Sequence, residues 1–290
     1  MYNYNGDSMK RIRIKRWIKV LFFLIVILVG IYLYSRYIEP KNIIVKEYSI
    51  INSNIPDNFY GFKIVQISDI NYKISNNKDT LDKLVKKINS LKPDIVILSG
   101  DLFYKSINYT EDDYNDLTNF LSSIDYNVSK YAIKGENDID SKWEDIINSS
   151  NFIDLNDKYE LIYNESTIPI LLVGISSNYS SNHIKETIDN IYEKIDTDYY
   201  SILVLHEPDF ISYIDYSKFN LILSGHSLNG VIKLPYIRGI IKSKYSTVYF
   251  DEYYNLGNTD MYISSGIGTN KHKIRLLNPP SISLYRLRNK

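Results

Sequence analysis

Six residues with metal-binding side chains each follow an apolar run of the chain by only a few positions. Carboxylates, a carboxamide and neutral imidazoles all bind divalent cations, and thiolate ligands are absent because the chain has no cysteine. If the apolar runs are strands of an open α/β sheet, their carboxyl ends form a crevice where these side chains converge. We therefore predict a divalent-metal centre suited to metal-assisted hydrolysis. The residues are Asp69 and Asn71 after 62–67, Asp101 after 95–98, Glu136 after 131–133, His206 after 202–205, and His226 after 221–223.

Each of these residues has an ordinary alternative role when it is taken alone. Ser-Asp and Gly-Asp are common turn dipeptides, because a short polar side chain caps the neighbouring backbone. The position of all of them at strand ends in one chain favours a shared site. The remaining histidines, His183 and His272, are expected to be solvated surface residues. Lys73 is expected to be a surface lysine, the alternative being a stand-in for a missing cation.

Five short segments carry a resemblance to a known family. In chain order they are similar to the motifs of the calcineurin-like metallophosphoesterase superfamily, and in particular of its small membrane-anchored bacterial branch. The stretches 261–269, 274–276 and 278–280 resemble the closing motif of that branch. The resemblance implies an α/β fold, a four-layer α/β/β/α sandwich with two metal ions at the strand ends. The segments are Ser68-Asp69-Ile70-Asn71, Ser99-Gly100-Asp101, Gly135-Glu136-Asn137-Asp138, Leu205-His206-Glu207-Pro208-Asp209 and Ser224-Gly225-His226-Ser227-Leu228.

The resemblance also implies a ligand set for each metal. The second metal would take Asp101 as the bridging carboxylate, together with Glu136, His206 and His226, where Glu136 replaces an asparagine of the family. Two imidazoles and two carboxylates suit a borderline divalent ion such as Mn, Zn or Fe. We expect one strong metal site at these residues.

The first metal site of the family pattern is incomplete. Asn71 and Leu228 stand where the family has histidines, so Asp69, the Asn71 amide oxygen and Asp101 remain as an all-oxygen set. We expect at most one weak site there. If no cation separates Asp69 from Asp101, their repulsion should raise one of their pKa values.

The resemblance places Asn137 and Asp138 in the catalytic positions. Asn137 replaces the acid-side histidine of the family and cannot donate a proton to a leaving group. Asp138 keeps its family identity and is expected to orient residue 137. Three functions stay open. The first is hydrolysis of phosphate mono- or diesters by a metal-activated water. The second is an eroded pseudoenzyme that binds a metal, an anionic envelope component or a protein partner. The third is a repurposed single-metal hydrolase.

The N-terminal residues predict a membrane anchor. Six basic residues lie within 10–19, and the following run 20–34 has no charge. With its flanking aromatic residues, the stretch 17–37 is long enough to cross a bilayer. We predict a basic cytoplasmic tail (1–16), a transmembrane anchor (17–37), a linker (38–43) and one extracytoplasmic domain (44–290) of a single-pass protein of the cell membrane. A cleaved signal peptide and a buried soluble helix are the alternatives.

The rest of the chain alternates apolar runs with amphipathic segments, which predicts βαβ units and parallel pairing. Nucleic acid is not expected as a partner, because 34 basic residues balance 34 acidic ones. Asn229-Gly230 resembles a hairpin turn. We expect helices at 80–91, 114–124, 142–148 and 184–195. We expect strands at 43–51, 62–67, 94–98, 130–133, 160–163, 168–173, 201–205, 220–223, 231–234, 245–250, 261–264 and 281–287.

Overall fold

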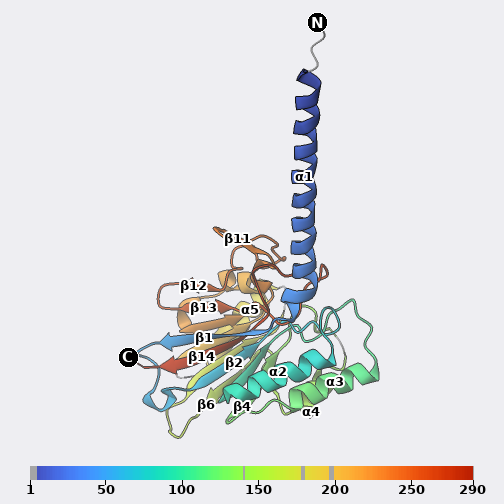
Figure 1. The fold of residues 1–290 in the computed structure, drawn as a ribbon. Coiled ribbons are helices and arrows are strands. Elements are labelled where there is room, and N and C mark those ends of the chain that lie inside the picture. The colour runs from blue at the N-terminus through green and yellow to red at the C-terminus, as the bar shows by residue number, and fades with distance from the viewer. Residues whose placement is uncertain (1–4, 140, 178–179, 196–198, 290) are drawn as a thin grey trace.

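Two six-stranded β-sheets face each other and form the frame of the folded domain (Figure 1). The computed structural model describes residues 5–139, 141–177, 180–195 and 199–289, and side chains from residue 15 onward. In spatial order, the first sheet contains β1 (Ile44–Ile51), β14 (Ser281–Arg288), β2 (Lys63–Ile67), β3 (Ile95–Ser99), β4 (Ser129–Ile133) and β5 (Ile153–Asp154). The second contains β12 (Tyr253–Asn255), β13 (Asp260–Ile263), β9 (Leu221–Ser224), β8 (Ser201–Leu205), β7 (Ile170–Ile175) and β6 (Lys158–Ile162).

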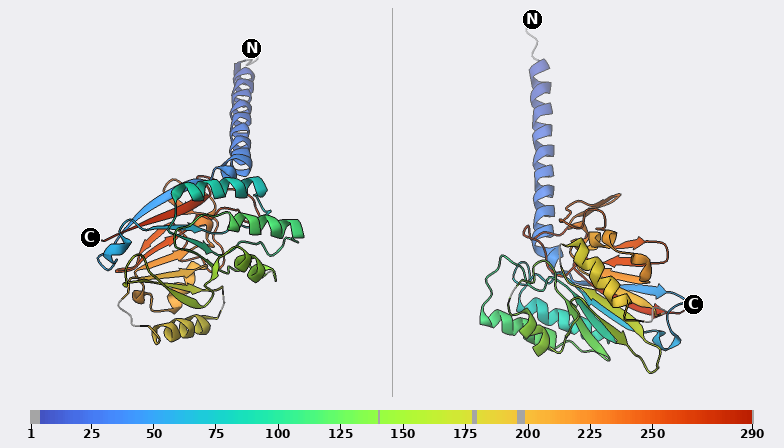
Figure 2. Two further views of the ribbon diagram at one scale, coloured as in Figure 1. Left: turned by 90° about the horizontal axis from the view of Figure 1, so that it is seen from below. Right: turned by 180° about the vertical axis from the view of Figure 1, so that it is seen from behind.

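Helices cover the outer face of each sheet, as Figure 2 shows from two further sides. The first sheet carries α2 (Lys78–Leu91), α3 (Glu111–Ser122) and α4 (Trp143–Ser149), and the second carries α5 (Ser181–Tyr192). Side-chain N-caps define the starts of α2 and α3: the Asn77 side chain accepts from Thr80 N, and Thr110 forms a capping box with Asp113. The order helix, sheet, sheet, helix confirms the predicted four-layer sandwich.

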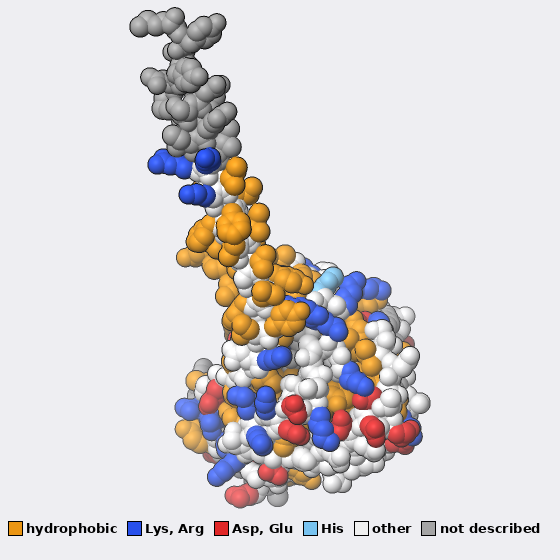
Figure 3. Space-filling view, turned by 45° about the vertical axis from the view of Figure 1, so that its right-hand side comes forward, with side chains coloured by type: hydrophobic (Ala, Val, Ile, Leu, Met, Phe, Trp, Pro, Cys, Tyr) orange, Lys and Arg blue, Asp and Glu red, His pale blue; other side chains and the backbone are white. Residues whose placement is uncertain are grey.

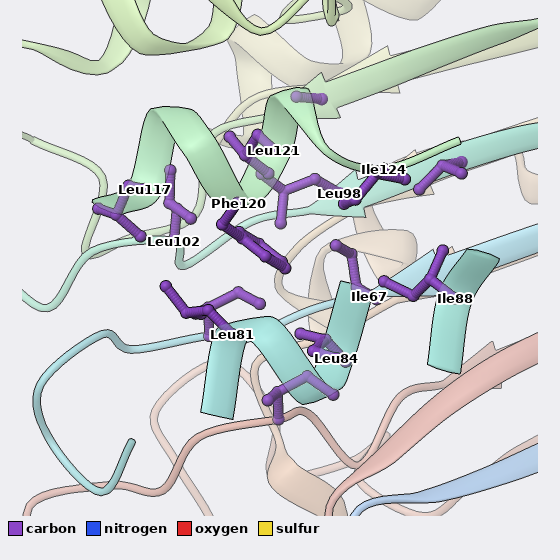
Figure 4. Close-up of a cluster of buried hydrophobic side chains, with 14 of the residues drawn as sticks. Ile67, Leu81, Leu84, Ile88, Leu98, Leu102, Leu117, Phe120, Leu121 and Ile124 are labelled. Carbon is purple, nitrogen blue, oxygen red and sulfur yellow. The ribbon is translucent and has the colours of Figure 1, made fainter. Parts of the chain in front are cut away.

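The core has three layers of buried apolar side chains. One layer lies between the two sheets, and the other two lie between each sheet and its helices. Both faces of the central strands are therefore covered, which explains why β3 and β8 are apolar almost throughout. Each buried Leu or Ile contributes about 1.5–3 kcal/mol to stability. Figure 4 shows the layer under α2 and α3, with Ile67, Leu81, Leu84, Ile88, Leu98, Leu102, Leu117, Phe120, Leu121 and Ile124.

The long N-terminal helix joins the domain at one particular edge of the first sheet. α1 (Asn5–Leu33) continues through a π-helical turn (Tyr34–Ile38) and a 3₁₀ turn (Glu39–Lys41) into β1. β1 is parallel to β14, and β14 is antiparallel to β2. The start of β1 therefore lies at the edge where β2 ends.

Hydrogen bonds hold the junction between helix and domain against the C-terminal loop. The carbonyl oxygen of Ser35 accepts from Arg275 N at 2.9 Å, and Arg36 donates to the carbonyl oxygen of Lys273 at 3.0 Å. The buried Glu39 carboxylate accepts from the backbone N–H groups of Leu277 and Asn278. Within the segment predicted as a linker (38–43), Glu39–Lys41 form a 3₁₀ turn whose buried Glu39 is bonded to the C-terminal loop.

Two expectations for the C-terminal half are wrong. Residues 245–250 form a loop, because the Asp209 carboxylate accepts the N–H groups of Thr247, Val248 and Tyr249 that a strand would use. Asn229-Gly230 does not connect paired strands and instead lies in a 3₁₀ turn. The hairpin in this region consists of β10 (Lys233–Leu234) and β11 (Ile237–Gly239), two residues apart.

Candidate metal centre

The candidate site lies at the edge where the central strands of both sheets end. β2, β3 and β4 end shortly before Asp69, Asp101 and Glu136, and β8 and β9 end before His206 and His226. Within each sheet these strands are parallel neighbours, so their final residues lie at the same edge. The backbone then turns sharply, with positive φ at Asp69 (50°), Asp101 (57°) and His226 (65°). Such conformations cost about 1–2 kcal/mol in an L-residue, so the surrounding packing enforces them.

Asp101, His206 and His226 form the centre of the site. One ligand atom from each lies within 4.8 Å of the other two, and all three side chains are buried. His206 Nε2 is 3.2 Å from an Asp101 carboxylate oxygen and 3.9 Å from one of Asp69. Ligands of a tetrahedral ion with bonds of about 2.1 Å lie about 3.4 Å apart, which is close to these separations.

Hydrogen bonds to backbone carbonyl groups determine which nitrogen of each imidazole carries its proton. His206 Nδ1 is 2.7 Å from the carbonyl oxygen of Ser99, so in the neutral imidazole Nδ1–H donates and Nε2 carries the lone pair that a metal ion would use. His226 Nε2 donates to the carbonyl oxygen of Lys244, which leaves Nδ1 with the lone pair. Among the described residues, His206 Nε2 is a buried atom without an assigned hydrogen-bond partner, although an Asp101 carboxylate oxygen lies 3.2 Å away. Metal-binding histidines are typically oriented in this way, so these residues fit a divalent ion.

The charges around the centre favour a cation. Burial alone would lower the pKa of His206, but the Asp101 and Asp69 carboxylates outweigh it and raise that pKa well above its ordinary value. Burial would raise the pKa of Asp101, but the two histidines and the N–H of Asn137 lower it. The field that holds a proton on His206 also favours a metal ion among these groups.

Two glycines allow the ligand loops to approach each other. Gly100 has φ +100°, and a Cβ atom there would lie 2.4 Å from His206 Nδ1. A Cβ atom on Gly225 would lie 2.0 Å from Ser68 Oγ. A larger residue at either position would displace the side chains that surround Asp69 and Asp101.

The region around Asp69 differs in chemistry. Its carboxylate accepts from Ser68 Oγ at 2.6 Å and from His226 N at 3.1 Å. Asn71 Oδ1 is buried and has no hydrogen-bond partner in the described part of the chain, so it offers one oxygen ligand. Leu228 is 4% exposed. Its side chain packs closely against Gly266, where an added Cβ atom would lie 2.6 Å from Leu228 Cδ2. Alkyl carbon thus lines this wall of the pocket.

The pKa of Asp69 is raised, in the direction expected for a carboxylate near Asp101 without a cation between them. Burial is the largest cause, and the Asp101 charge adds to it. The charge of His206 and the Ser68 hydroxyl act in the opposite direction. The pKa of Asp101 itself is lowered. The repulsion between the two carboxylates therefore contributes to the raised pKa of Asp69.

The three residues of the Glu136-Asn137-Asp138 segment have separate environments. Asn137 donates its backbone N–H and its amide N–H to the two Asp101 oxygens, at 2.9 and 2.6 Å. Asp138 accepts from the N–H groups of Asp101, Phe103 and Gly135, and burial with the Asp101 charge raises its pKa to about 7. It therefore positions backbone rather than the side chain of residue 137. Glu136 lines the pocket, 3.8 Å from Lys105 Nζ, and its role as a ligand stays a prediction.

An open pocket of about 410 Å³ leads to the centre. Basic and polar residues from three loops form its mouth, which places positive charge where an anionic substrate would enter. Sequence reasoning missed these residues, and it left His272 as a surface histidine, although this exposed side chain lines the mouth. Lys73 pairs with Asp113 at 2.8 Å, which agrees with its expected surface role. The newly found residues are Tyr104, Lys105, Ile241, Lys242, Ser243, Asn270, Lys271 and His272.

Comparison with known proteins agrees with this geometry. The chain is 29% identical over 266 residues to the metallophosphoesterase YkuE of Bacillus subtilis (strain 168), covering 90% of this chain and 91% of YkuE. It is 24% identical over 323 residues to the UDP-2,3-diacylglucosamine pyrophosphatase LpxG of Chlamydia trachomatis (serovar D), covering 88% and 92%.

Two further matches are a solved structure and a family model. The solved NAD nucleotidase NadN of Haemophilus influenzae is similar with a TM-score of 0.46 and 12% identity, over 71% of this chain and 50% of that one. That likeness carries no functional argument. The family model for calcineurin-like phosphoesterases matches residues 62–230, which is more than half of the chain. The chain therefore belongs to the calcineurin-like phosphoesterase family.

Proposed function

We propose that the protein is a membrane-anchored, extracytoplasmic hydrolase of phosphate mono- or diesters that works from one strong divalent-metal site. The observation that carries the proposal is the pair of oriented imidazoles: His206 Nε2 and His226 Nδ1 keep their lone pairs beside the Asp101 carboxylate, in a pocket open to substrate. His206 Nε2 is buried without a hydrogen-bond partner among the described residues, and a divalent ion at this position would give it one.

The residues of the site have separate roles in the proposed hydrolysis. A divalent ion held by Asp101, His206 and His226 would supply Lewis acidity to a phosphoryl oxygen and to a water. Lys242 and Lys271 at the mouth attract the anionic group of the substrate. Asn137 holds Asp101 in place through two hydrogen bonds but transfers no proton.

The substrate should therefore have a good leaving group. General acid catalysis contributes about 10²–10⁴ in rate, and the amide of Asn137 cannot supply it. Activated esters and diphosphates depend less on such a proton than alkyl phosphates do. The similarity to a relative named as a UDP-2,3-diacylglucosamine pyrophosphatase supports this class of phosphate compound.

The N-terminal helix supports the proposed location. Residues 15–41 form a helical stretch that is long and apolar enough to cross a membrane, and a signal sequence would pass the same test. By the positive-inside rule, the basic residues that precede its apolar part would stay in the cytoplasm, which supports an extracytoplasmic domain. Figure 3 shows the apolar band of the helix continuing to the surface of the domain.

A non-catalytic binding protein is the second candidate function, and Leu228 favours it. The leucine side chain lines the pocket beside Asp69, where the family pattern has a histidine. Together with Asn71 and Asn137, it removes three groups of a two-metal hydrolase. Such a protein would still bind one metal and an anionic ligand in the same pocket.

Metal content and turnover of the full chain in detergent separate the two functions. The hydrolase predicts about one tightly bound Mn or Zn ion per chain and turnover of a chromogenic phosphodiester, both lost in His226→Ala. His183→Ala is the matched control, because His183 lies against Asp157 on the surface and should change neither quantity. One bound metal without turnover at high protein concentration would establish the binding function instead.

A further inference from the structure

We propose that the β10–β11 hairpin and the adjacent 270–277 loop form a membrane-contact surface that holds the pocket mouth at the headgroup level of the membrane spanned by α1. This inference rests on the proposed function and names its substrate class: a phosphate-bearing headgroup of an amphiphile whose acyl chains stay in the bilayer. Figures 1 and 2 place the hairpin on the same side of the domain as the lower end of α1.

The anchor is fixed directly to a wall of the pocket. Residues 270–272 line the pocket, and the next residues of the same loop, 273–278, exchange hydrogen bonds with the helix junction. Ser35 contacts Arg275, and Glu39 contacts Leu277. The membrane helix therefore cannot turn freely against the pocket, and the orientation of the mouth relative to the bilayer is set by the fold.

Exposure of the junction locates the end of the bilayer. Tyr37 and Ile38 are 57% and 58% exposed, yet Glu39, the next residue, is buried in the domain. Tyr37 and Ile38 thus extend the exposed apolar side chains of the helix to the domain surface, while Arg36 before them donates to the carbonyl oxygen of Lys273. The interfacial region of the bilayer must then touch the loops that surround Glu39.

The hairpin presents apolar side chains at this level. Tyr236 is fully exposed, and Ile237, Ile240 and Leu277 are 59%, 49% and 56% exposed. Hydrogen bonds connect the hairpin to the anchored loop, because the N–H of Lys233 donates to the carbonyl oxygen of Leu276 at 2.9 Å. A connected apolar surface of this kind marks an interaction site, and the adjacent lipid is its occupant.

Basic side chains accompany the apolar ones. Arg238 on the hairpin and Lys242 and Lys271 at the pocket mouth are exposed, and Figure 3 shows Lys and Arg side chains on the domain beside the lower end of the helix. Apolar and aromatic residues interleaved with cations are typical of surfaces that bind anionic headgroups. Because Lys242 and Lys271 also line the pocket, a headgroup phosphate would enter the site directly from the membrane.

Fluorescence quenching tests the contact with the full chain. The chain has no cysteine, so Tyr236→Cys and Tyr60→Cys each accept a single environment-sensitive fluorophore. Tyr60 is 64% exposed and precedes β2, at the opposite edge of the first sheet, which makes it the matched control. The proteins are placed in phosphatidylcholine–phosphatidylglycerol nanodiscs with or without a nitroxide on the lipid acyl chain.

The expected result is nitroxide quenching of the label at position 236 and none at position 60. Quenching of label 236 by aqueous iodide but not by lipid nitroxide would show a solvated hairpin and overturn the proposal. Shielding from both quenchers would mean that protein covers the hairpin, which also overturns it. Equal lipid quenching at both positions would show unspecific adsorption and count equally against it.

A second variant tests the substrate class. Tyr236→Glu combined with Ile237→Glu should lower turnover of a lipid phosphoester in nanodiscs at least tenfold, and should leave turnover of a soluble chromogenic phosphodiester unchanged. Equal loss on both substrates would overturn the substrate class. Absence of turnover of either substrate by the unaltered protein would overturn the proposed function and with it the substrate class, whereas the quenching result decides the membrane contact separately.

Discussion

The two halves of the site share one backbone design but differ in the groups that the backbone presents. Around Asp101, two imidazoles are oriented by carbonyl groups and leave their lone pairs free. Around Asp69, one neighbour is an amide and another is a leucine. Positive φ occurs in both halves, at Asp101 (57°) and at Leu228 (47°).

The difference separates what holds the loops in shape from what binds a metal. Leu228 adopts a backbone conformation that L-residues avoid, although its side chain cannot act as a ligand. The conformation is therefore enforced by packing and hydrogen bonds, including the bond from Asn278 Nδ2 to the carbonyl oxygen of Leu228. A loop shaped for metal binding can persist without a metal ligand, so only the side chains decide which half is functional.

The largest expected effect comes from removing a ligand of the Asp101 half. His206→Ala should lower metal affinity by more than about 100-fold, since loss of a group that merely orients a ligand already costs about 10–100-fold. Asn71→Ala, its counterpart in the Asp69 half, should leave the strong metal bound. Metal content after dialysis against a weak chelator measures both. If the two variants lose metal equally, the halves do not differ in the way described.

Restoring histidines in the Asp69 half is the converse experiment. The triple change Asn71→His, Asn137→His, Leu228→His should raise metal content from about one ion towards two per chain. Turnover should rise by about 10²–10⁴, because an acid-side histidine is restored. The double variant that retains Leu228 is the control, and it should gain less metal. An unchanged metal content in the triple variant would contradict the assignment of these positions.

The sequence predicted the strand-end positions of the site but not its mouth. Asp101, His206 and His226 follow long apolar strands, whose pattern is readable because both faces are buried. The strands of the hairpin have two and three residues, too few for any periodicity. His272 lies in the loop that is hydrogen-bonded to the junction between α1 and the domain, and Lys242 follows Ile241, whose N–H donates to the carbonyl oxygen of Gly230. No local sequence pattern records these long-range contacts.

Residues 245–250 were wrongly predicted as a strand for the same reason, because the contact that decides their conformation is not local in the sequence. Their tyrosines and valine have the composition of a strand, and Tyr245 and Tyr249 pack against the outer layer of the second sheet. A single carboxylate, Asp209, takes up the N–H groups that would have formed a ladder. The composition thus indicated correctly that these tyrosines pack against the domain. The backbone conformation depends instead on Asp209, which is distant in the sequence.

A substitution at Gly100, where the loops of the Asp101 half approach each other closely, should have an intermediate effect on stability and metal binding. Gly100→Ala places a methyl group 2.4 Å from His206 Nδ1 at φ +100°, so it should lower the free energy of unfolding by about 2–3 kcal/mol and weaken metal binding. Gly61→Ala is the matched control: it has φ +82° with no atom within 4 Å, so it should cost only about 1 kcal/mol and leave metal binding intact. Urea unfolding with and without Mn measures both quantities. Equal losses in the two variants would mean that backbone strain alone matters.

Removing the charge of Asp69 should have the smallest effect and the opposite sign. The raised pKa of Asp69 means that the metal-free folded protein binds its proton more tightly than the unfolded chain does, so this group lowers stability as pH rises above its ordinary pKa of 3.8. Asp69→Asn abolishes that loss and keeps an oxygen that can accept from His226 N. At pH 7 the metal-free variant should therefore be more stable than the unaltered protein. Thermal unfolding in a chelator at pH 5 and pH 7 measures the difference, which should be larger at pH 7. A variant less stable than the unaltered protein at both pH values would show that the carboxylate stabilises the Asp69 half even without a metal.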